Sequence, residues 1–270
     1  MTQKTTTGWL DTILAQKRIE IEKLHESWDS DFTVRRVPLE VSESLARPIG
    51  APLHLVCEVK MKSPSAGELS TKLTPDARAL AYVKGGASMV SVLVDEKFFG
   101  GCWGDLERVR MALDGQRREV PLLAKEFVLD EVQLSVARAK GADAVLLIAR
   151  IVTADRLIEL ARAAARSGLT PLVEIASEAE LEVALSTKAK MIGVNARDLD
   201  SLAIDPARAT RLIAAIPRDR IAVHLSGVRT EADVKALARG RADAVLLGEV
   251  LMREDAPESL VARFVNAAFG

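Results

Sequence analysis

Charged and polar side chains of complementary types stand at the ends of several short apolar segments. Glu58 and Lys60 close the first of these segments, Lys125 closes the third, and Glu174 and Asn195 close the fifth and sixth. Carboxylates and ammonium groups that meet around one substrate can accept and donate protons, which is the basis of general acid–base catalysis. A single charge at such a place is usually a solvated strand end, but its recurrence at several segments favours one shared site.

Small and cationic residues follow the later segments and suggest a place for a phosphate group. Arg197 lies just beyond the sixth segment, Ser226 and Gly227 follow the seventh, and Gly248 ends the eighth. Backbone N–H groups at glycine-containing turns and at helix N-termini bind phosphate. A Ser-Gly pair alone is usually only a turn, so this prediction depends on where the fold places these turns.

Other kinds of catalytic centre find little support in the sequence. The histidines, His25, His54 and His224, lack the spacing of metal ligands, and there is no Walker loop, G-x-G-x-x-G loop or nucleophile elbow. Cys57 and Cys102 form neither a C-x-x-C pair nor a disulfide framework. We therefore expect a site without a metal ion.

Composition and charge narrow the class of protein. The 270 residues carry 37 Lys and Arg against 38 Asp and Glu, a net charge of −1. This balance argues against nucleic acid as the main partner, because binding a phosphate backbone requires a basic excess. No stretch approaches the roughly 18 uninterrupted apolar residues of a membrane span, and the N-terminal residues lack the apolar core of a signal peptide. We expect a cytoplasmic protein with neither a nucleic-acid nor a membrane partner.

The elements that must position these side chains alternate between short strands and amphipathic helices. Eight near-continuous apolar runs are typical of strands buried on both faces of a parallel sheet. They are His54–Lys60, Met89–Val94, Pro121–Phe127, Ala142–Ile148, Thr170–Ile175, Lys190–Asn195, Arg220–Ser226 and Ala242–Gly248. Eight strands separated by helices predict an α/β protein with a closed (β/α)₈ barrel, and an open doubly wound sheet is the alternative.

Local signals agree with this organisation. Thr153, Asp205 before Pro206, and Thr230 are each expected to cap the start of a helix. The motif A-D-A-V-L-L occurs at 142–147 and again at 242–247, which supports a repeat architecture modestly.

The first 50 residues fall outside this repeat. Thr7 can cap a helix that runs to about Ser27, and a second short helix is predicted around Ser42–Ala46, before Pro48. We expect residues 1–50 to form a helical extension packed on a barrel of residues 51–270. Periodicity alone leaves two positions open for it, a cap over the bottom of the barrel or a lid over the active site.

A barrel brings the carboxyl ends of all its strands to one mouth, where barrel enzymes carry out their chemistry. Side chains two residues apart on a strand share a face, so Lys125 and Phe127 point the same way, as do Glu58 and Lys60. The loops after the seventh and eighth strands are where barrels often bind phosphate, which strengthens the prediction made from the glycines there.

Taken in order, the motifs of this chain resemble those of the indole-3-glycerol phosphate synthase family. The resemblance covers nearly the whole chain, including the helical extension. It is carried by the segments E-V-K-M-K-S-P-S-A-G, S-V-L-V-D-E-K-F-F-G-G, L-A-K-E-F-V-L-D-E-V-Q, G-A-D-A-V-L-L-I, L-V-E-I, G-V-N-A-R-D-L, L-S-G-V and L-L-G-E-V-L-M. It implies a cofactor-free lyase that converts 1-(2-carboxyphenylamino)-1-deoxyribulose 5-phosphate to indole-3-glycerol phosphate with loss of CO₂ and water. The partner implied is thus a small anionic phosphate substrate, while the oligomeric state, a monomer or a weak dimer, stays open.

The resemblance also implies a role for each residue at the centre of the site. Lys125 would be the general acid that protonates the substrate ketone, and Glu174 the base of the later dehydration. Glu58 would hold the lysines and the anilino nitrogen, and Asn195 would position the substrate hydroxyls. Lys60 would contact the substrate carboxylate or act as a second acid, and the sequence does not separate these roles.

The remaining site residues would hold the two ends of the substrate. The phosphate would be surrounded by Arg197, Ser226, Gly227, Gly248 and the backbone of Glu249. Ser63 and Pro64 would order the first loop, and Phe127 would pack against the aromatic ring.

The chain departs from the family pattern at three positions. Glu126 stands where K-D-F has aspartate, and Ala196 where N-N-R-D-L has asparagine. Both should face away from the barrel interior, so we expect little effect. Leu225 stands where the seventh strand normally ends E-S-G, and this position should point inward. A carboxylate is then missing near Lys125, which should lower the pKa of that lysine.

Several functions therefore remain open from the sequence. The first is the synthase reaction, and the second is a weakened or specialised paralogue acting on a related aryl-amino sugar phosphate in secondary metabolism. The third is a non-catalytic barrel that keeps phosphate recognition, against which the retained acids, lysines and asparagine argue. Another phosphate-binding barrel, such as phosphoribosylanthranilate isomerase, would explain neither Lys125 together with Glu174 nor the N-terminal helices.

Overall fold

The computed structural model describes residues 8–28, 36–63, 67–70, 72–199 and 201–270 of the chain. Its centre is a sheet of eight parallel strands in the order β1, β4, β5, β6, β7, β8, β9 and β10, and β10 pairs with β1. The sheet is therefore closed, and no strand of it has a free edge. The predicted (β/α)₈ barrel is confirmed, and the open doubly wound sheet is excluded.

The strands lie close to their predicted ranges, because their apolar runs are buried on both faces. They are β1 (His54–Val59), β4 (Met89–Leu93), β5 (Leu122–Lys125), β6 (Ala144–Ile148), β7 (Thr170–Ile175), β8 (Met191–Asn195), β9 (Ile221–Leu225) and β10 (Ala244–Leu247). A short antiparallel pair that the sequence did not predict follows β1, formed by β2 (Lys62–Ser63) and β3 (Gly67–Glu68).

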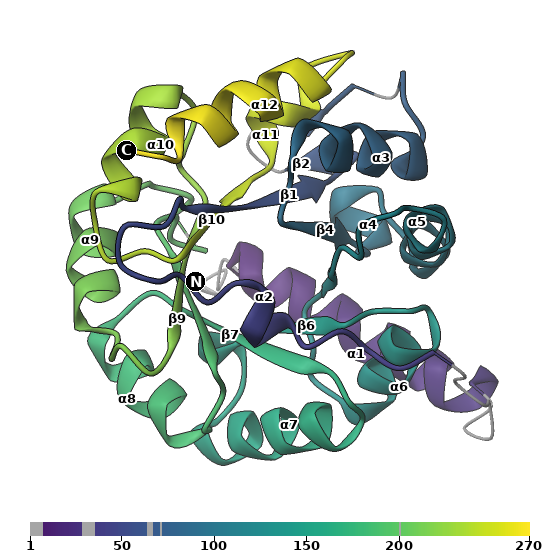
Figure 1. Ribbon diagram of the computed structural model, residues 1–270. Coiled ribbons are helices and arrows are strands. Elements are labelled where there is room, and N and C mark those ends of the chain that lie inside the picture. Colours follow the sequence, from purple (N-terminus) through teal and green to yellow (C-terminus); the bar gives the residue numbers. More distant parts are fainter. Residues whose placement is uncertain (1–7, 29–35, 64–66, 71, 200) are drawn as a thin grey trace, which may run out of the picture.

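Helices form a ring around the barrel (Figure 1). They are α3 (Pro75–Gly85), α4 (Glu96–Phe99), α5 (Trp103–Asp114), α6 (Glu131–Ala139), the 3₁₀ turn η1 (Ala149–Ile151), α7 (Ala154–Arg166), α8 (Glu178–Ser186), α9 (Pro206–Ala215), α10 (Glu231–Ala238), α11 (Glu249–Met252) and α12 (Glu258–Ala267). The predicted caps are confirmed: Thr153, Asp205 and Thr230 each accept a hydrogen bond from a backbone N–H in the first turn of α7, α9 and α10. Within the described ranges, no helix has both the length and the apolar character needed to cross a membrane.

Alternation along the strands sorts their apolar side chains into two layers. Val56, Met89 and Leu123 belong to a cluster that fills the barrel, whereas the neighbouring Cys57 and Val90 pack beneath the helices. Because side chains fill the interior, a polar site can lie only at an end of the barrel.

The repeated A-D-A-V-L-L motif gives an aspartate the same role at two places. Asp143 precedes β6 and accepts a hydrogen bond from the Leu122 N–H at 2.9 Å. Asp243 precedes β10 and accepts one from the Ala222 N–H at 2.7 Å. Each buried carboxylate ties the start of its own strand to the strand before it, so the sequence repeat corresponds to a structural repeat.

The N-terminal extension reaches both ends of the barrel, so each of the two positions left open by the sequence is occupied. Helix α1 (Trp9–Ser27) crosses the mouth, where Lys17 contacts Asp95 and Glu126 just beyond β4 and β5. Helix α1 begins after Gly8, and the predicted cap Thr7 lies outside the described residues.

The second part of the extension closes the opposite end of the barrel. Helix α2 (Val41–Ser44) is followed by Arg47, whose guanidinium donates hydrogen bonds to the carbonyls of Ala238 and Ala242, ahead of β10. Leu45 is completely buried in the cluster that fills the barrel. This part of the extension acts as the bottom cap.

Candidate active site

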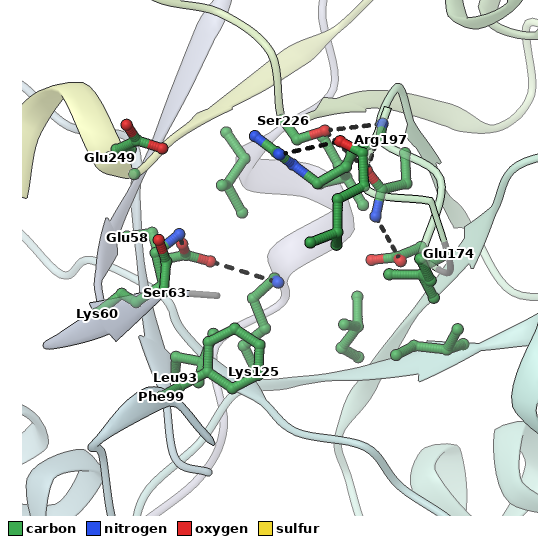
Figure 2. A pocket seen from close by; sticks show the side chains of 18 of the residues that line it. Glu58, Lys60, Ser63, Leu93, Phe99, Lys125, Glu174, Arg197, Ser226 and Glu249 are labelled. Atoms are coloured by element: carbon green, nitrogen blue, oxygen red, sulfur yellow. Dashed lines mark hydrogen bonds and ion pairs between the residues drawn. The ribbon is translucent and has the colours of Figure 1, made fainter. Parts of the chain in front are cut away.

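A pocket lies at the mouth of the barrel, at the carboxyl ends of the strands (Figure 2). Residues of α1 belong to its lining. Its polar lining is Glu58, Lys60, Ser63, Lys125, Glu126, Glu174, Asn195, Arg197, Ser226, Arg229 and Glu249, with Gly227 and Gly248. Its apolar lining is Trp9, Leu10, Ile13, Leu93, Phe99, Phe127, Leu146, Ile148, Leu199, Leu202, Leu225, Val228 and Leu246. Every predicted site residue that the structure describes lines this pocket, and Pro64 lies outside the described residues.

Glu58 at the end of β1 lies between two ammonium groups. Its Oε1 is 2.7 Å from Lys60 Nζ, and its Oε2 is 3.5 Å from Lys125 Nζ on β5. Burial opposes ionisation of Glu58, but the two lysines outweigh burial and lower its pKa to about 2. Glu58 is therefore a fixed anion that holds both lysines in the mouth.

Lys125 and Glu174 have the protonation properties of an acid and a base. Burial favours the neutral amine of Lys125, but Glu58 and Glu174 outweigh burial and raise its pKa, so the side chain is a charged proton donor. Burial raises the pKa of Glu174 above its usual range, opposed by Lys125 and by a hydrogen bond from Asn195. A carboxylate whose pKa lies above its usual range is a better proton acceptor than an ordinary one.

A chain of hydrogen bonds fixes Glu174. The Ser226 hydroxyl donates to Asn195 Oδ1 at 2.7 Å, and Asn195 Nδ2 donates to Glu174 Oε1 at 2.9 Å. The Arg197 N–H donates to Asn195 Oδ1 at 3.0 Å and also to the Ser226 hydroxyl oxygen at 3.2 Å. Residues at the carboxyl ends of β8 and β9 thus orient a carboxylate on β7 (Figure 2).

The backbone after β9 turns sharply to present Ser226. Its φ is +70° and that of Gly227 is +87°, so two successive residues occupy the left-handed region, which is sparsely populated except by glycine. Such backbone is typical of functional sites, where surrounding contacts hold it. Here the contacts of the Ser226 hydroxyl with Asn195 and Arg197 hold it.

Gly248, after β10, lies against the paired charges on β1. A Cβ atom at this position would be 2.6 Å from Glu58 Oε1 and 3.4 Å from Lys60 Nζ. Any larger residue here would require either the Glu58 side chain or the loop to shift. The next residue, Glu249, is bonded to Arg253 at 2.8 Å, and this contact lowers its pKa.

No metal-binding cluster is evident in the described parts of the chain. No three His, Cys, Asp or Glu side chains among them are placed to hold an ion.

Known proteins match nearly the whole length of the chain. The family model described as indole-3-glycerol phosphate synthase matches residues 10–264. The chain belongs to the indole-3-glycerol phosphate synthase family. The indole-3-glycerol phosphate synthase of Streptomyces griseus is 40% identical over 252 residues, which cover 93% of this chain and 89% of that protein. The one from Opitutus terrae is 41% identical over 258 residues, which cover 93% of this chain and 96% of that protein.

Similarity to solved structures extends beyond the family at the level of the fold. Thiamine phosphate pyrophosphorylase from Pyrococcus furiosus has a TM-score of 0.59 at 14% identity, covering 83% of this chain and 100% of that one. This likeness concerns the barrel alone.

One departure from the indole-3-glycerol phosphate synthase pattern lies inside the site. Leu225 points into the barrel as expected and is 2% exposed, with its Cδ1 over Gly193, where a Cβ would lie 2.6 Å away. The pKa of Lys125 nevertheless lies above its ordinary value, because Glu58 and Glu174 still supply two carboxylates. That a third carboxylate at position 225 would raise it further stays a prediction.

Of the other two departures, Ala196 faces away from the barrel interior as predicted, whereas Glu126 lies at the mouth and belongs to the pocket lining. Ala196 is buried in the layer beneath the helices. Glu126 meets α1, where its Oε2 is 3.0 Å from Lys17 Nζ. Lys17 is 1% exposed and also contacts Asp95 at 2.7 Å, so Glu126 helps to hold α1 on the mouth of this indole-3-glycerol phosphate synthase family member.

The sequence did not predict the aromatic part of the site. The rings of Phe99 and Phe127 are 6.0 Å apart, and Trp9 meets Phe98 edge-on at 5.2 Å. Phe127 was predicted, but the sequence did not indicate that Leu10 and Ile13 of α1 line the same pocket. Arg229, a second arginine of the lining, was also missed because it lies within a turn.

Proposed function

We propose that this chain is an indole-3-glycerol phosphate synthase, a carboxy-lyase that closes 1-(2-carboxyphenylamino)-1-deoxyribulose 5-phosphate to indole-3-glycerol phosphate, CO₂ and water. The observation that carries the proposal is the placement of Lys125 between Glu58 and Glu174 at the mouth of the barrel. It supplies a charged acid and a buried base around one cavity. Family membership supports the same reaction.

Ring closure is the first step that this geometry supports. The aromatic carbon that bears the carboxylate attacks the ketone carbon, and the ketone oxygen gains negative charge as the new bond forms. Lys125 donates a proton to that oxygen, and its ammonium stabilises the charge before the proton is transferred. Loss of CO₂ then returns the electron pair of the broken bond to the ring.

Dehydration completes the indole. Glu174 removes a proton from the carbon next to the nitrogen, while the hydroxyl made in the first step takes a proton from an ammonium group of the mouth and leaves as water. Asn195 holds the Glu174 carboxylate through its hydrogen bond to Oε1. Glu58 stays ionised and orients both lysines. Lys60, 2.7 Å from Glu58, either binds the substrate carboxylate or provides a second acid.

The two ends of the mouth suit the two ends of this substrate. Arg197, Ser226, Gly227, Gly248 and Glu249 lie on the loops after β8, β9 and β10, where barrels bind phosphate. Phe127 and the apolar residues of α1 lie on the side suited to the aromatic ring. Ser63 follows β1 and belongs to the same lining.

A fluorescence assay for the indole product tests the proposal. We expect the purified protein to form indole-3-glycerol phosphate from the standard substrate and Lys125→Ala to reduce kcat by roughly 10²-fold or more, the typical contribution of a general acid. Lys140→Ala is the matched control, because Lys140 is bonded to Glu107 on the outer surface. Activity that survives Lys125→Ala would contradict the assigned acid.

Leu225 favours a second candidate, a weakened or specialised paralogue that acts on a related aryl-amino sugar phosphate. An apolar side chain in the lining removes one hydrogen-bonding group from the side of the pocket that holds Asn195 and Ser226. Turnover of the standard substrate before and after Leu225→Glu distinguishes the two. An increase favours the specialised paralogue, and a rate typical of the family that the substitution leaves unchanged rules it out.

We also propose that the enzyme works in the cytoplasm. The two cysteines, Cys57 and Cys102, are both free, as is usual in a reducing compartment. Cell fractionation with an antibody against the chain tests the location, and recovery from an exported fraction would overturn it.

A further inference from the structure

A fully buried arginine on α3 takes no part in the chemistry described above. Arg78 is 0% exposed, and its Nη1 donates hydrogen bonds to the carbonyls of Leu251 at 3.1 Å and Glu254 at 3.0 Å. Among the described residues no carboxylate forms an ion pair with it, and its Nε and Nη2 have no hydrogen-bond acceptor. The Tyr82 hydroxyl and, farther away, the Asp255 carboxylate are its other polar neighbours. Burying a charge without a counter-ion is costly, so an apolar residue would be the more stable choice at this position.

Of the two carbonyls that Arg78 binds, that of Leu251 is in the last turn of α11 and that of Glu254 lies two residues beyond its end. The last carbonyls of a helix have no partner within the helix, and a cation placed there compensates for them. The start of the same short helix is at the active site, where Gly248 and Glu249 line the pocket. Arg78 therefore holds the distal end of a segment whose other end meets the substrate.

Tyr82, one turn further along α3, connects the same helix to β1. Its hydroxyl donates to the carbonyl of Glu58 at 3.2 Å and lies 3.4 Å from Met252 Sδ, and the side chain is completely buried. Since Arg78 and Tyr82 are four residues apart, they lie on one face of α3. This face spans the junction between the Glu58 backbone and α11.

The distance across that junction is critical. Gly248 is so close to Glu58 that a single added carbon would be 2.6 Å from Oε1. A small shift of α11 would therefore disturb both the Glu58–Lys60 pair and the backbone that faces the phosphate. Ser70 and Lys72, in the loop before α3, also contact Asp255 after α11. These contacts are exposed and screened by solvent, whereas Arg78 is completely buried.

We propose that Arg78 is a positioning residue for the phosphate side of the active site, anchoring the end of α11 so that Gly248 and Glu249 keep a fixed distance from Glu58 and Lys60. Arg78 does not touch the substrate. The role in catalysis rests on the proposed synthase function, whereas the anchoring of α11 does not.

Two substitutions of Arg78 test the proposal by separating stability from activity. Arg78→Met removes the charge and fills the space, so we expect a melting temperature equal to or above that of the wild type. At the same time KM for the substrate should rise on the order of tenfold, with a smaller change in kcat, because α11 is misplaced. The inhibition constant of inorganic phosphate should rise in parallel with KM. Arg78→Lys keeps a donor for the carbonyls, so its KM and its inhibition constant should lie between those of Arg78→Met and the wild type.

Lys84→Met is the control, because Lys84 is an exposed residue on the same helix. A wild-type KM and phosphate inhibition in Arg78→Met would overturn the proposal. A fall in melting temperature with a proportionate loss of kcat and no change in KM would overturn it too, since it would indicate a purely structural residue.

Hydrogen exchange provides a readout that needs no turnover. The amides of Met252 and Arg253 donate to the carbonyls of Gly248 and Glu249 within α11. They should exchange faster in Arg78→Met than in Lys84→Met, and equal rates would contradict the anchor. If Arg78→Met does not fold, Arg78→Lys is compared with the wild type by the same measurements. If the amides of α11 exchange faster in Arg78→Met but the wild-type protein has no synthase activity, the anchoring role of Arg78 is supported and the proposed function is overturned.

Discussion

At the scale of the residue, neighbouring charges give two buried glutamates of the same mouth opposite properties. Glu58 has two ammonium partners and a pKa of about 2, whereas Glu174 shares one lysine and has a pKa above its usual range. One carboxylate is thereby fixed as an anion, and the other can take up a proton. This divergence is what a site needs to carry out acid and base chemistry with the same residue types.

Glu58→Gln tests the electrostatic hold on Lys125. Because Glu58 raises the pKa of Lys125, its removal should lower that pKa, and the ammonium form should be lost at lower pH. We expect the alkaline limb of the kcat/KM profile to move to lower pH. Glu107→Gln, at an exposed glutamate of α5, is the control. An alkaline limb at the same pH in Glu58→Gln and the wild type would show that Glu58 does not raise the pKa of Lys125.

Gly248→Ala tests the close approach across β1 and β10. The new methyl group would be 2.6 Å from Glu58 Oε1, so either the carboxylate or the loop must move. We expect kcat/KM to fall by roughly 10²-fold, the typical effect of misplacing catalytic groups by about 1 Å. Gly115→Ala is the comparison, because its nearest contact would be an ordinary 3.7 Å. Equal kcat/KM in Gly248→Ala and Gly115→Ala would show that a methyl group at position 248 does not displace the catalytic groups.

At the scale of the element, the N-terminal helix is held on the mouth by a buried cation shared among acids. Lys17 is 2.7 Å from both Glu20 and Asp95 and 3.0 Å from Glu126. One ammonium faces three carboxylates. Burial together with the nearby Asp95 raises the pKa of Glu126 to about 7, although Lys17 opposes this shift.

Glu126→Gln is expected to change how stability depends on pH. The pKa of Glu126 in the folded protein is about 7, above the pKa of a glutamate in the unfolded chain. Protonation of Glu126 therefore favours the folded state, and this stabilisation is lost as the pH rises through about 7. Denaturant unfolding should show that the free energy of unfolding decreases more between pH 5 and pH 8 in the wild type than in Glu126→Gln. Identical pH dependence would mean that Glu126 titrates normally.

The sequence predicted the barrel and most of its mouth, but not the attachment of α1. Strand ends such as Lys125 and Glu174 could be identified because a closed sheet brings all carboxyl ends together. Lys17 could not, because a lysine on an amphipathic helix reads as a solvated charge, and its partner Glu126 is 109 residues away. Periodicity identifies a buried face but not what covers it, which also explains why Trp9 and Phe99 were missed.

At the scale of the whole molecule, the two ends of the barrel have separate tasks. The mouth carries the charged site, whereas the bottom carries a buried acid with purely structural contacts. Asp143 binds Arg36 at 2.6 Å, Arg110 at 3.3 Å and the N–H groups of Leu39 and Leu122. It joins the N-terminal extension, α5 and β5 at the end remote from catalysis.

Asp143→Ala should therefore reduce stability without changing the chemistry. Removing a completely buried carboxylate leaves two arginines and two N–H groups without their partner, which typically costs about 3–5 kcal/mol of unfolding free energy. Urea unfolding measures this cost, while kcat/KM at a temperature where the variant is folded should stay near that of the wild type. A large fall in kcat/KM under those conditions would show that the two ends are coupled.

The pairing of β1 with β10 has a consequence for how the protein comes into being. The seam joins the first strand of the barrel to the last, so one edge of β1 has no partner until the final βα unit has been made. Contacts so distant along the chain form slowly, and an open apolar edge favours aggregation in the meantime. Glu58 and Gly248 lie on opposite sides of this seam, so a growing chain has no catalytic mouth until the ring closes.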